Sequence, residues 1–228
     1  LIIRNDAGYL RLSELLTAAY VGKDRNIHHA ELNPEWLESS DNSGLICLSG
    51  AHYGEVGVNL LNGNEDAARA AALKYAAWFP DAFYLELQRL PERPEWEACV
   101  SGSVKLAEEL GLPVVATHPT QFMSRDDFNA HEARVCIAGG WVLTDKKRPR
   151  DFTPSQFFIP PETMLERFAD LPEALENTVE IAKRCNIHIT LGKNFLPLFP
   201  TPDGLSLDDY LVKLSNEGLQ ERMVQLYP

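Results

Sequence analysis

The 228-residue sequence has no long apolar run, and it has fewer basic than acidic residues. No stretch approaches the roughly 18 consecutive apolar residues of a membrane-spanning helix, so we expect no membrane partner. There are 21 Lys and Arg against 33 Asp and Glu, which gives a formal net charge of −12. A chain this acidic is a poor non-specific partner for nucleic acid and for an anionic membrane surface.

Cysteine pairs and targeting signals are also missing. The 4 cysteines are widely spaced and form no Cys-x-x-Cys pair, which excludes a zinc ribbon. Scattered thiols of this kind are typical of reduced core residues, so we expect a cytoplasmic protein. The chain starts at Leu1 with no initiator Met, basic region or apolar signal segment, and resembles a strand cut from a longer protein.

The motifs of several enzyme classes are absent. There is no G-x-x-x-x-G-K-[ST] phosphate loop, no G-x-G-x-x-G fingerprint and no G-x-S-x-G nucleophile elbow. Adjacent carboxylates occur at Asp126-Asp127 and Asp208-Asp209, at expected helix starts, where acidic residues usually cap the helix. We therefore expect no two-metal polymerase centre within these residues.

Short apolar runs bounded by glycine or proline alternate with helical patterns. The expected strands are 44–50, 83–87 and 113–117, and the expected helices between them are 55–61, 64–78 and 94–110. Such crossovers favour an α/β fold with a parallel sheet covered by helices, either an open sheet or a barrel. In both, functional groups lie at the carboxyl ends of the strands.

Further elements are expected on either side of this alternation. The additional helices are 9–20, a short one beginning at Pro34, 125–138, 161–168, 172–184 and 207–226. A last strand is expected at 187–191, and the segment 195–204, with three prolines, is typical of a linker. We therefore place one domain at 1–194 and a linker with a helix at 195–228.

Histidines just past the expected strand ends are the strongest candidates for chemistry. His52 follows the strand at 44–50, and His118 follows the strand at 113–117. A catalytic zinc needs about three protein ligands, and none lies two or three residues from His118, which favours a hydrogen-bonding role. Asp127 and His131 share one helix face at a spacing of four, which favours a structural pair.

A basic loop containing proline follows the helix at 125–138. Lys146, Lys147, Arg148 and Arg150 make a local positive patch on an otherwise acidic chain. Two interpretations stay open for this patch. It is either a solvated loop or a contact with nucleic-acid phosphate or an acidic partner protein.

Long blocks of the sequence carry a family resemblance. The blocks are GLICLSG (44–50), FYLELQR (83–89), GLPVVAT (111–117), DFNAHEARVCIAGG (127–140), KRPRDFTPSQFF (147–158), LPEALENTVEIAKRCNI (171–187) and FLPLFPTPDGLSLDDYLVKLSNEGLQERM (195–223). Together, in this order, they resemble the alpha subunits of bacterial DNA polymerase III. The matching region is the latter part of the N-terminal PHP (polymerase and histidinol phosphatase) domain, with the first residues leading towards the palm.

The resemblance implies part of a distorted (β/α)7 barrel with a short helical extension. It also implies that the parent protein is a DNA-directed DNA polymerase of the replisome, a nucleotidyltransferase acting on primer-template DNA. The parent's Mg²⁺ is expected at palm aspartates outside these residues, and no cofactor is expected within them. The implied partners are the proofreading exonuclease subunit and other polymerase III holoenzyme subunits.

The metal positions of the family are altered in this chain. In metal-binding relatives Asn-Asp-Val-His follows the last of these strands, whereas this chain has His-Pro-Thr-Gln, with Pro119 and Gln121 at ligand positions. A cysteine position becomes Ala51. Proline has no donor atom and a Gln amide is a weak ligand, so the resemblance implies an inactive region that docks the exonuclease subunit. The alternative is a retained metal-dependent phosphoesterase or 3′–5′ exonuclease, with a weak site rebuilt from His52 and His118.

Overall fold

The computed structural model describes residues 1–23, 25–26, 28–38, 41–194 and 196–227. The chain divides into two units, Leu1–His188 and Ile189–Pro228, and each is described by itself. Among the described residues, none of the helices combines the length and the apolar content that crossing a membrane requires.

Within the described residues, the first unit contains a four-stranded sheet in the order β1-β2-β3-β4. The strands are β1 (Ile2–Ile3), β2 (Leu45–Leu48), β3 (Phe83–Leu87) and β4 (Val114–Ala116). Strands β2, β3 and β4 run parallel, which confirms the sequence prediction, with Cys47 opposite Phe83 and Leu85 opposite Val114. The short β1 is antiparallel to β2, so the sheet is mixed rather than wholly parallel.

The helices fall where the sequence predicts them. They are α1 (Asp6–Val21), α2 (Pro34–Glu38), α3 (Glu55–Leu61), α4 (Glu65–Trp78), α5 (Glu97–Leu110), α6 (Phe128–Gly139), α7 (Pro161–Arg167) and α8 (Pro172–Arg184). Short 3₁₀ turns accompany them, namely η1 (Ala51–Tyr53), η2 (Pro94–Trp96) and η3 (Arg125–Asp127). Gly111 ends α5 at a φ of +66°, the left-handed conformation that glycine adopts without strain.

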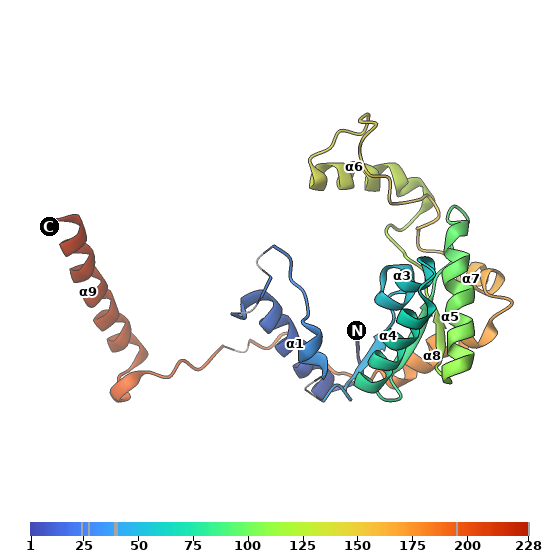
Figure 1. Ribbon diagram of the computed structural model, residues 1–228. Coiled ribbons are helices and arrows are strands. Elements are labelled where there is room, and N and C mark those ends of the chain that lie inside the picture. Colours follow the sequence, from blue (N-terminus) through green and yellow to red (C-terminus); the bar gives the residue numbers. More distant parts are fainter. Residues whose placement is uncertain (24, 27, 39–40, 195, 228) are drawn as a thin grey trace. The chain divides into compact units, whose positions relative to one another are not determined.

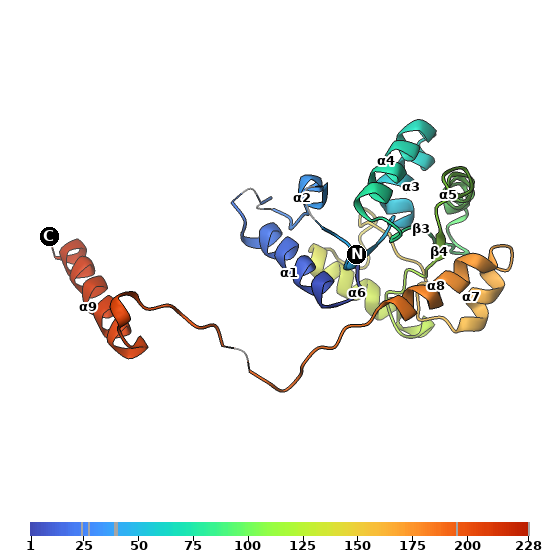
Figure 2. The ribbon, with the colours of Figure 1, turned by 90° about the horizontal axis from the view of Figure 1, so that it is seen from below.

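Apolar strands and small helix residues build the core. Leu45, Ile46 and Leu85 are completely buried, as expected for strands covered on both faces. Alanines on the inner face of α4 keep that helix close to its neighbours. Helices α3, α4 and α5 lie together beside the sheet, while α8 packs on β4 (Figures 1 and 2). This arrangement leaves the carboxyl ends of β2, β3 and β4 at one edge.

The strand expected at 187–191 is wrong. Residues 185–190 form no regular structure after α8, and the backbone N–H of Asn186 donates to the carbonyl of Arg4 at 2.7 Å. The side chains of Ile189 and Leu191 are exposed. An apolar alternation makes a strand only where a neighbouring strand supplies a ladder of hydrogen bonds and a buried face.

The second unit contains a linker and one long helix among its described residues. A short 3₁₀ turn, η4 (Pro202–Gly204), precedes α9 (Leu207–Leu226), which confirms the predicted terminal helix. The Oγ of Ser206 accepts a hydrogen bond from the backbone N–H of Asp209 at 3.1 Å and caps the helix start. None of the residues of α9 is buried.

A close backbone contact between α3 and η1 generates the first prediction. A Cβ added at Gly57 would lie 1.9 Å from the carbonyl oxygen of Ala51. We expect Gly57→Ala to lower the free energy of unfolding by about 1–3 kcal/mol, because overpacking forces the turn and the helix apart. Urea denaturation followed by circular dichroism measures this change.

Gly102→Ala in α5 is the matched control for that substitution. A Cβ at this position meets only the mobile end of the Leu60 side chain, at 3.1 Å, and alanine favours the helix. We expect little change or a small gain in stability. Equal losses in both variants would contradict the role assigned to the α3–η1 contact.

Candidate functional site

A hydrogen-bond network joins the carboxyl ends of the three parallel strands. Its centre is the Glu86 carboxylate, whose Oε1 accepts from Thr117 Oγ1 at 2.5 Å and whose Oε2 accepts from the backbone N–H of Gly50 at 3.1 Å. The Gln88 amide donates to Glu86 Oε1 and to Thr117 Oγ1, at 3.3 and 2.9 Å. The backbone N–H of Glu86 donates to Ser49 Oγ at 2.9 Å. Protein donors therefore surround this carboxylate.

Sequence reasoning missed Glu86 as a functional residue. The available signal was a charged residue inside the apolar run 83–87, since a half-buried carboxylate must find hydrogen-bond donors. The identity of those donors depends on cross-strand neighbours, which a linear pattern does not give.

The turn after β2 places Ala51 at the position where metal-binding relatives have a cysteine. Gly50 and Ala51 have φ values of +81° and +46°, and the Ala51 side chain is buried. The left-handed backbone at Ala51 is unusual for a residue with a Cβ, and it turns the chain sharply into η1. Ala51 offers no donor atom to a metal ion.

His52 is packed as an aromatic ring. It is buried and stacks on Trp96, with ring centroids 3.5 Å apart and an interplanar angle of 23°. Among the described residues, neither ring nitrogen has a hydrogen-bond partner. Burial, and then the positive charge of Arg93, lower the pKa of His52. The ring is therefore held neutral within an aromatic contact.

His118 uses both ring nitrogens within the protein. Nε2 lies 2.9 Å from the carbonyl oxygen of Phe157, and Nδ1 lies 3.3 Å from Nη1 of Arg167. We assign the neutral tautomer in which Nε2–H donates to the carbonyl and Nδ1 accepts from the guanidinium. Burial lowers the pKa of His118, and the nearby Arg167 lowers it further.

The side chains that follow His118 do not converge on it. The carbonyl of Pro119 accepts a hydrogen bond from the Gln156 amide at 3.2 Å, and the backbone N–H of Gln121 donates to the Gln156 carbonyl at 2.8 Å. The Gln121 side chain itself is exposed. This stretch therefore pairs with the chain near Gln156 rather than enclosing an ion.

The residues at this edge do not fit a metal cluster. Within the described residues, no group of three or more His, Cys, Asp or Glu side chains could hold a metal ion. The Glu86 oxygens and the His118 nitrogens are engaged in hydrogen bonds, and the His52 nitrogens belong to a buried ring that stacks on Trp96. A cation beside His118 would also lie close to the positive charge of Arg167.

The expected pairing of Asp127 with His131 is wrong. The Asp127 carboxylate accepts from the backbone N–H and the Oγ of Ser124, both at 2.9 Å, and forms a capping box at η3. His131 is buried between the rings of Phe122 and Phe152, with centroids 5.2 and 4.6 Å away. The Asp127 carboxylate therefore caps the helix start and does not pair with His131.

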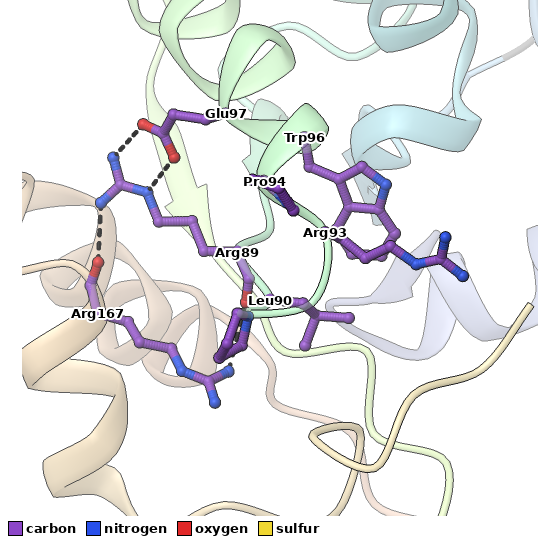
Figure 3. Close-up of a pocket in the computed structure, with 8 residues that line it drawn as sticks. Arg89, Leu90, Arg93, Pro94, Trp96, Glu97 and Arg167 are labelled. Carbon is purple, nitrogen blue, oxygen red and sulfur yellow. Dashed lines mark hydrogen bonds and ion pairs between the residues drawn. The ribbon is translucent and has the colours of Figure 1, made fainter.

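A pocket of about 370 Å³ lies beside Trp96, which stacks on His52, and Arg167, which contacts His118 (Figure 3). Its lining residues are Arg89, Leu90, Pro91, Arg93, Pro94, Trp96, Glu97 and Arg167. Figure 3 shows the three guanidinium groups pointing away from one another. Arg89 pairs with Glu97 and Asp170, at 2.8 and 2.6 Å, and these carboxylates raise its pKa. The guanidinium groups therefore do not converge on a common anion-binding position, and the charge of Arg89 is already paired with carboxylates.

The basic loop separates into one buried and three exposed cations. Arg148 is 9% exposed, and its Nη1 lies 2.5 Å from Glu132 Oε2 on α6. Its Nε donates to the carbonyl of Leu143 at 3.2 Å. Arg148 is therefore a structural brace and is not available to a phosphate. Lys146, Lys147 and Arg150 are exposed.

Comparisons with known proteins identify relatives of this chain. Residues 1–90 match the PHP domain model. The whole chain is 97% identical to part of the DNA polymerase III subunit alpha of Neisseria meningitidis serogroup A and 46% identical to that of Pseudomonas fluorescens. Over 224 residues, 98% of the chain, it is 47% identical to the Escherichia coli K12 subunit. The chain covers 19–20% of the length of these relatives.

The buried His52 and His131 and the half-buried His118 predict a loss of stability in acid. The pKa values of His52, His118 and His131 are all lowered in the folded chain. When the pH falls below the ordinary histidine pKa, the unfolded chain therefore binds more protons than the folded chain does. We expect the free energy of unfolding to fall as the pH is lowered from about 7.5 to about 5. Urea denaturation at a series of pH values measures this slope.

His118→Gln isolates the contribution of one ring. The Gln amide keeps a donor near the Phe157 carbonyl but does not titrate, so the slope should decrease by at most about 1.4 kcal/mol per pH unit. A slope identical to that of the unsubstituted chain would contradict the assignment of a neutral, hydrogen-bonded His118.

Proposed function

Because this chain belongs to the family of DNA polymerase III alpha subunits, which it matches along its whole length, we propose that the protein carrying it is a replicative DNA-directed DNA polymerase. Its substrates are deoxynucleotides and primer-template DNA, and its Mg²⁺-binding palm aspartates lie outside these residues. Its location is cytoplasmic, within the replisome. The parallel strands covered by helices form part of a distorted (β/α)7 PHP barrel, with α9 leading towards the palm.

Within this polymerase, residues 1–194 act as a scaffold without chemistry of their own. The observation that carries this proposal is that protein contacts already engage the ligand-type groups considered at the strand ends: hydrogen bonds hold Glu86 and His118, and the His52 ring stacks on Trp96. The Glu86 oxygens accept from Thr117 and Gly50, and the His118 ring is used on both sides. Ala51 and Pro119 add no donor side chain where the metal-binding relatives have ligands.

Binding of a divalent cation at this edge is energetically unfavourable. Each hydrogen bond to the Glu86 carboxylate that an ion displaces costs about 1.5–3 kcal/mol. Arg167 already places a positive charge 3.3 Å from His118 Nδ1, so an incoming cation meets repulsion instead of a vacant lone pair. These two effects act together against the alternative of a retained phosphoesterase or 3′–5′ exonuclease.

A region of this kind contributes to replication through its surface. We infer that it docks the proofreading exonuclease subunit, which the family resemblance implies as a partner of the polymerase. Docking surfaces require exposed apolar side chains, and Met123, Ile137 and Phe158 are all well exposed in this unit.

Metal content and nuclease activity test the proposed loss of chemistry. We expect the full-length polymerase, purified free of the exonuclease subunit, to extend primers with Mg²⁺ and to show no 3′–5′ exonuclease activity. Mass spectrometry of the metals should find no stoichiometric zinc or manganese. A chelator-sensitive exonuclease that disappears, together with its metal, in His118→Ala would contradict the proposal. Activity that persists in this variant but separates from the polymerase on further purification would come from a contaminating nuclease.

Cross-linking mass spectrometry tests the proposed docking. In a reconstituted complex of full-length polymerase and exonuclease subunit, we expect lysines of the first unit to cross-link to the exonuclease. Lys74, Lys105 and Lys146 are suitable reporters, because they belong to separate elements. A complex that forms with all of its cross-links outside residues 1–194 would show that another part of the polymerase holds the exonuclease.

A further inference from the structure

A groove of about 630 Å³ lies between α6 and the loop that follows it. Its lining residues are Arg134, Val135, Cys136, Ala138, Gly139, Trp141, Arg148, Pro149, Asp151 and Phe152. In Figure 1, α6 and this loop stand clear of helices α3, α4 and α5. The residues of the strand-end network do not line the groove, so its role is separate from the candidate site described above.

Two internal contacts hold the groove open. The ion pair between Arg148 and Glu132 ties the loop to α6, and both side chains are only 7% exposed. At the end of the helix, a Cβ added at Gly139 would lie 2.6 Å from the ring of Trp141, so the indole lies directly against the glycine. The backbone N–H of Trp141 donates to the carbonyl of Cys136 at 2.8 Å. The groove is therefore formed before any partner arrives.

Exposed apolar side chains neighbour the lining residues in the sequence, and Trp141 itself lines the groove. Ile137 and Val142 are 82% and 66% exposed, and Trp141 and Leu143 are 40% and 46% exposed. A soluble surface rarely gathers this much apolar area unless another molecule covers it. The apolar lining and these four side chains form one continuous stretch of the chain, from α6 into the loop.

Positive charge lies around the apolar surface. Arg134, Lys146, Lys147 and Arg150 are exposed on α6 and on the loop. The acids of the same segment are fewer: Glu132 pairs with Arg148, Asp145 accepts a hydrogen bond from the backbone N–H of Lys147 at 2.8 Å, and Asp151 lines the groove. On a chain with a net charge of −12, this segment is a local cationic surface and therefore selects partners of the opposite charge.

We propose that this groove binds an acidic, amphipathic peptide segment of a partner protein. Apolar side chains at helical spacing would enter the groove, and Asp or Glu on the flanks would meet the exposed cations. A single-stranded nucleic acid fits less well, because stacking of bases needs aromatic platforms and the apolar side chains here are mostly aliphatic. The inference holds whether or not the exonuclease subunit supplies the segment.

Fluorescence anisotropy with designed probes tests this proposal on the full-length polymerase. The probe is a fluorescein-labelled 16-residue peptide with Leu at positions i, i+3, i+4 and i+7 and Glu at most other positions. A scrambled peptide of equal composition and a labelled oligo-dT strand are the competing probes. We expect the amphipathic peptide to bind at least about tenfold more tightly than the scrambled peptide.

Substitutions on the two surfaces should each weaken the binding of the peptide. The triple variant Lys146→Glu, Lys147→Glu and Arg150→Glu should raise the dissociation constant about tenfold or more, because it reverses the charge of exposed side chains only. Gly139→Ala should also weaken binding, since it displaces Trp141 without changing any charge. Thermal unfolding shows whether each variant retains its fold, and the exposed charge variants remain informative if Gly139→Ala unfolds.

Matched controls lie on other elements of the same chain. Lys213→Glu on α9 changes charge, and Val179→Ser on α8 removes an exposed aliphatic side chain that is 54% accessible. Both should leave binding of the peptide unchanged. Equal affinity for the amphipathic and scrambled peptides would overturn the proposal. So would tight binding of oligo-dT that depends on the loop cations while the peptide does not bind, because the groove would then be a nucleic-acid interface.

Discussion

The Glu86 carboxylate is the group on which the strand-end edge depends. Its hydrogen bonds reach the turn after β2 through Gly50 and the end of β4 through Thr117, so one side chain of β3 ties three strands together. A half-buried carboxylate without such donors would destabilise the fold. The same hydrogen bonds occupy the oxygen atoms that a metal ion would need. The hydrogen bonds that stabilise this edge are therefore the same ones that engage the Glu86 oxygens.

Positive charge reinforces the same outcome from outside the sheet. Arg167, at the end of α7, contacts His118 next to the strand ends, while Arg89 joins Glu97 on α5 to Asp170 before α8. Burial lowers the pKa of Arg167, which reflects the cost of holding its charge in this position. These guanidinium groups connect the helices to the edge of the sheet.

Local patterns predicted most of the fold, and tertiary neighbours explain the failures. The strands at β2, β3 and β4 were predictable because short apolar runs between helical patterns are local signals. The strand expected at 187–191 failed because no neighbouring strand pairs with it along its length. Glu86 was missed because its partners come from other strands. Arg148 looked like one of four equivalent cations, and only its contact with Glu132, 16 residues earlier, distinguishes it.

The cations of the basic loop therefore have two different roles. Arg148 forms a buried ion pair with Glu132 that ties the loop to α6. Lys146, Lys147 and Arg150 remain exposed on the same loop, which also lines the apolar groove. At the strand ends, by contrast, Glu86, Thr117 and Gln88 form hydrogen bonds with one another. Side chains that are already paired gain little from a ligand, whereas exposed apolar and charged groups gain from being covered. The physical capacity of this region for interaction therefore lies on α6 and its loop rather than at the ends of its strands.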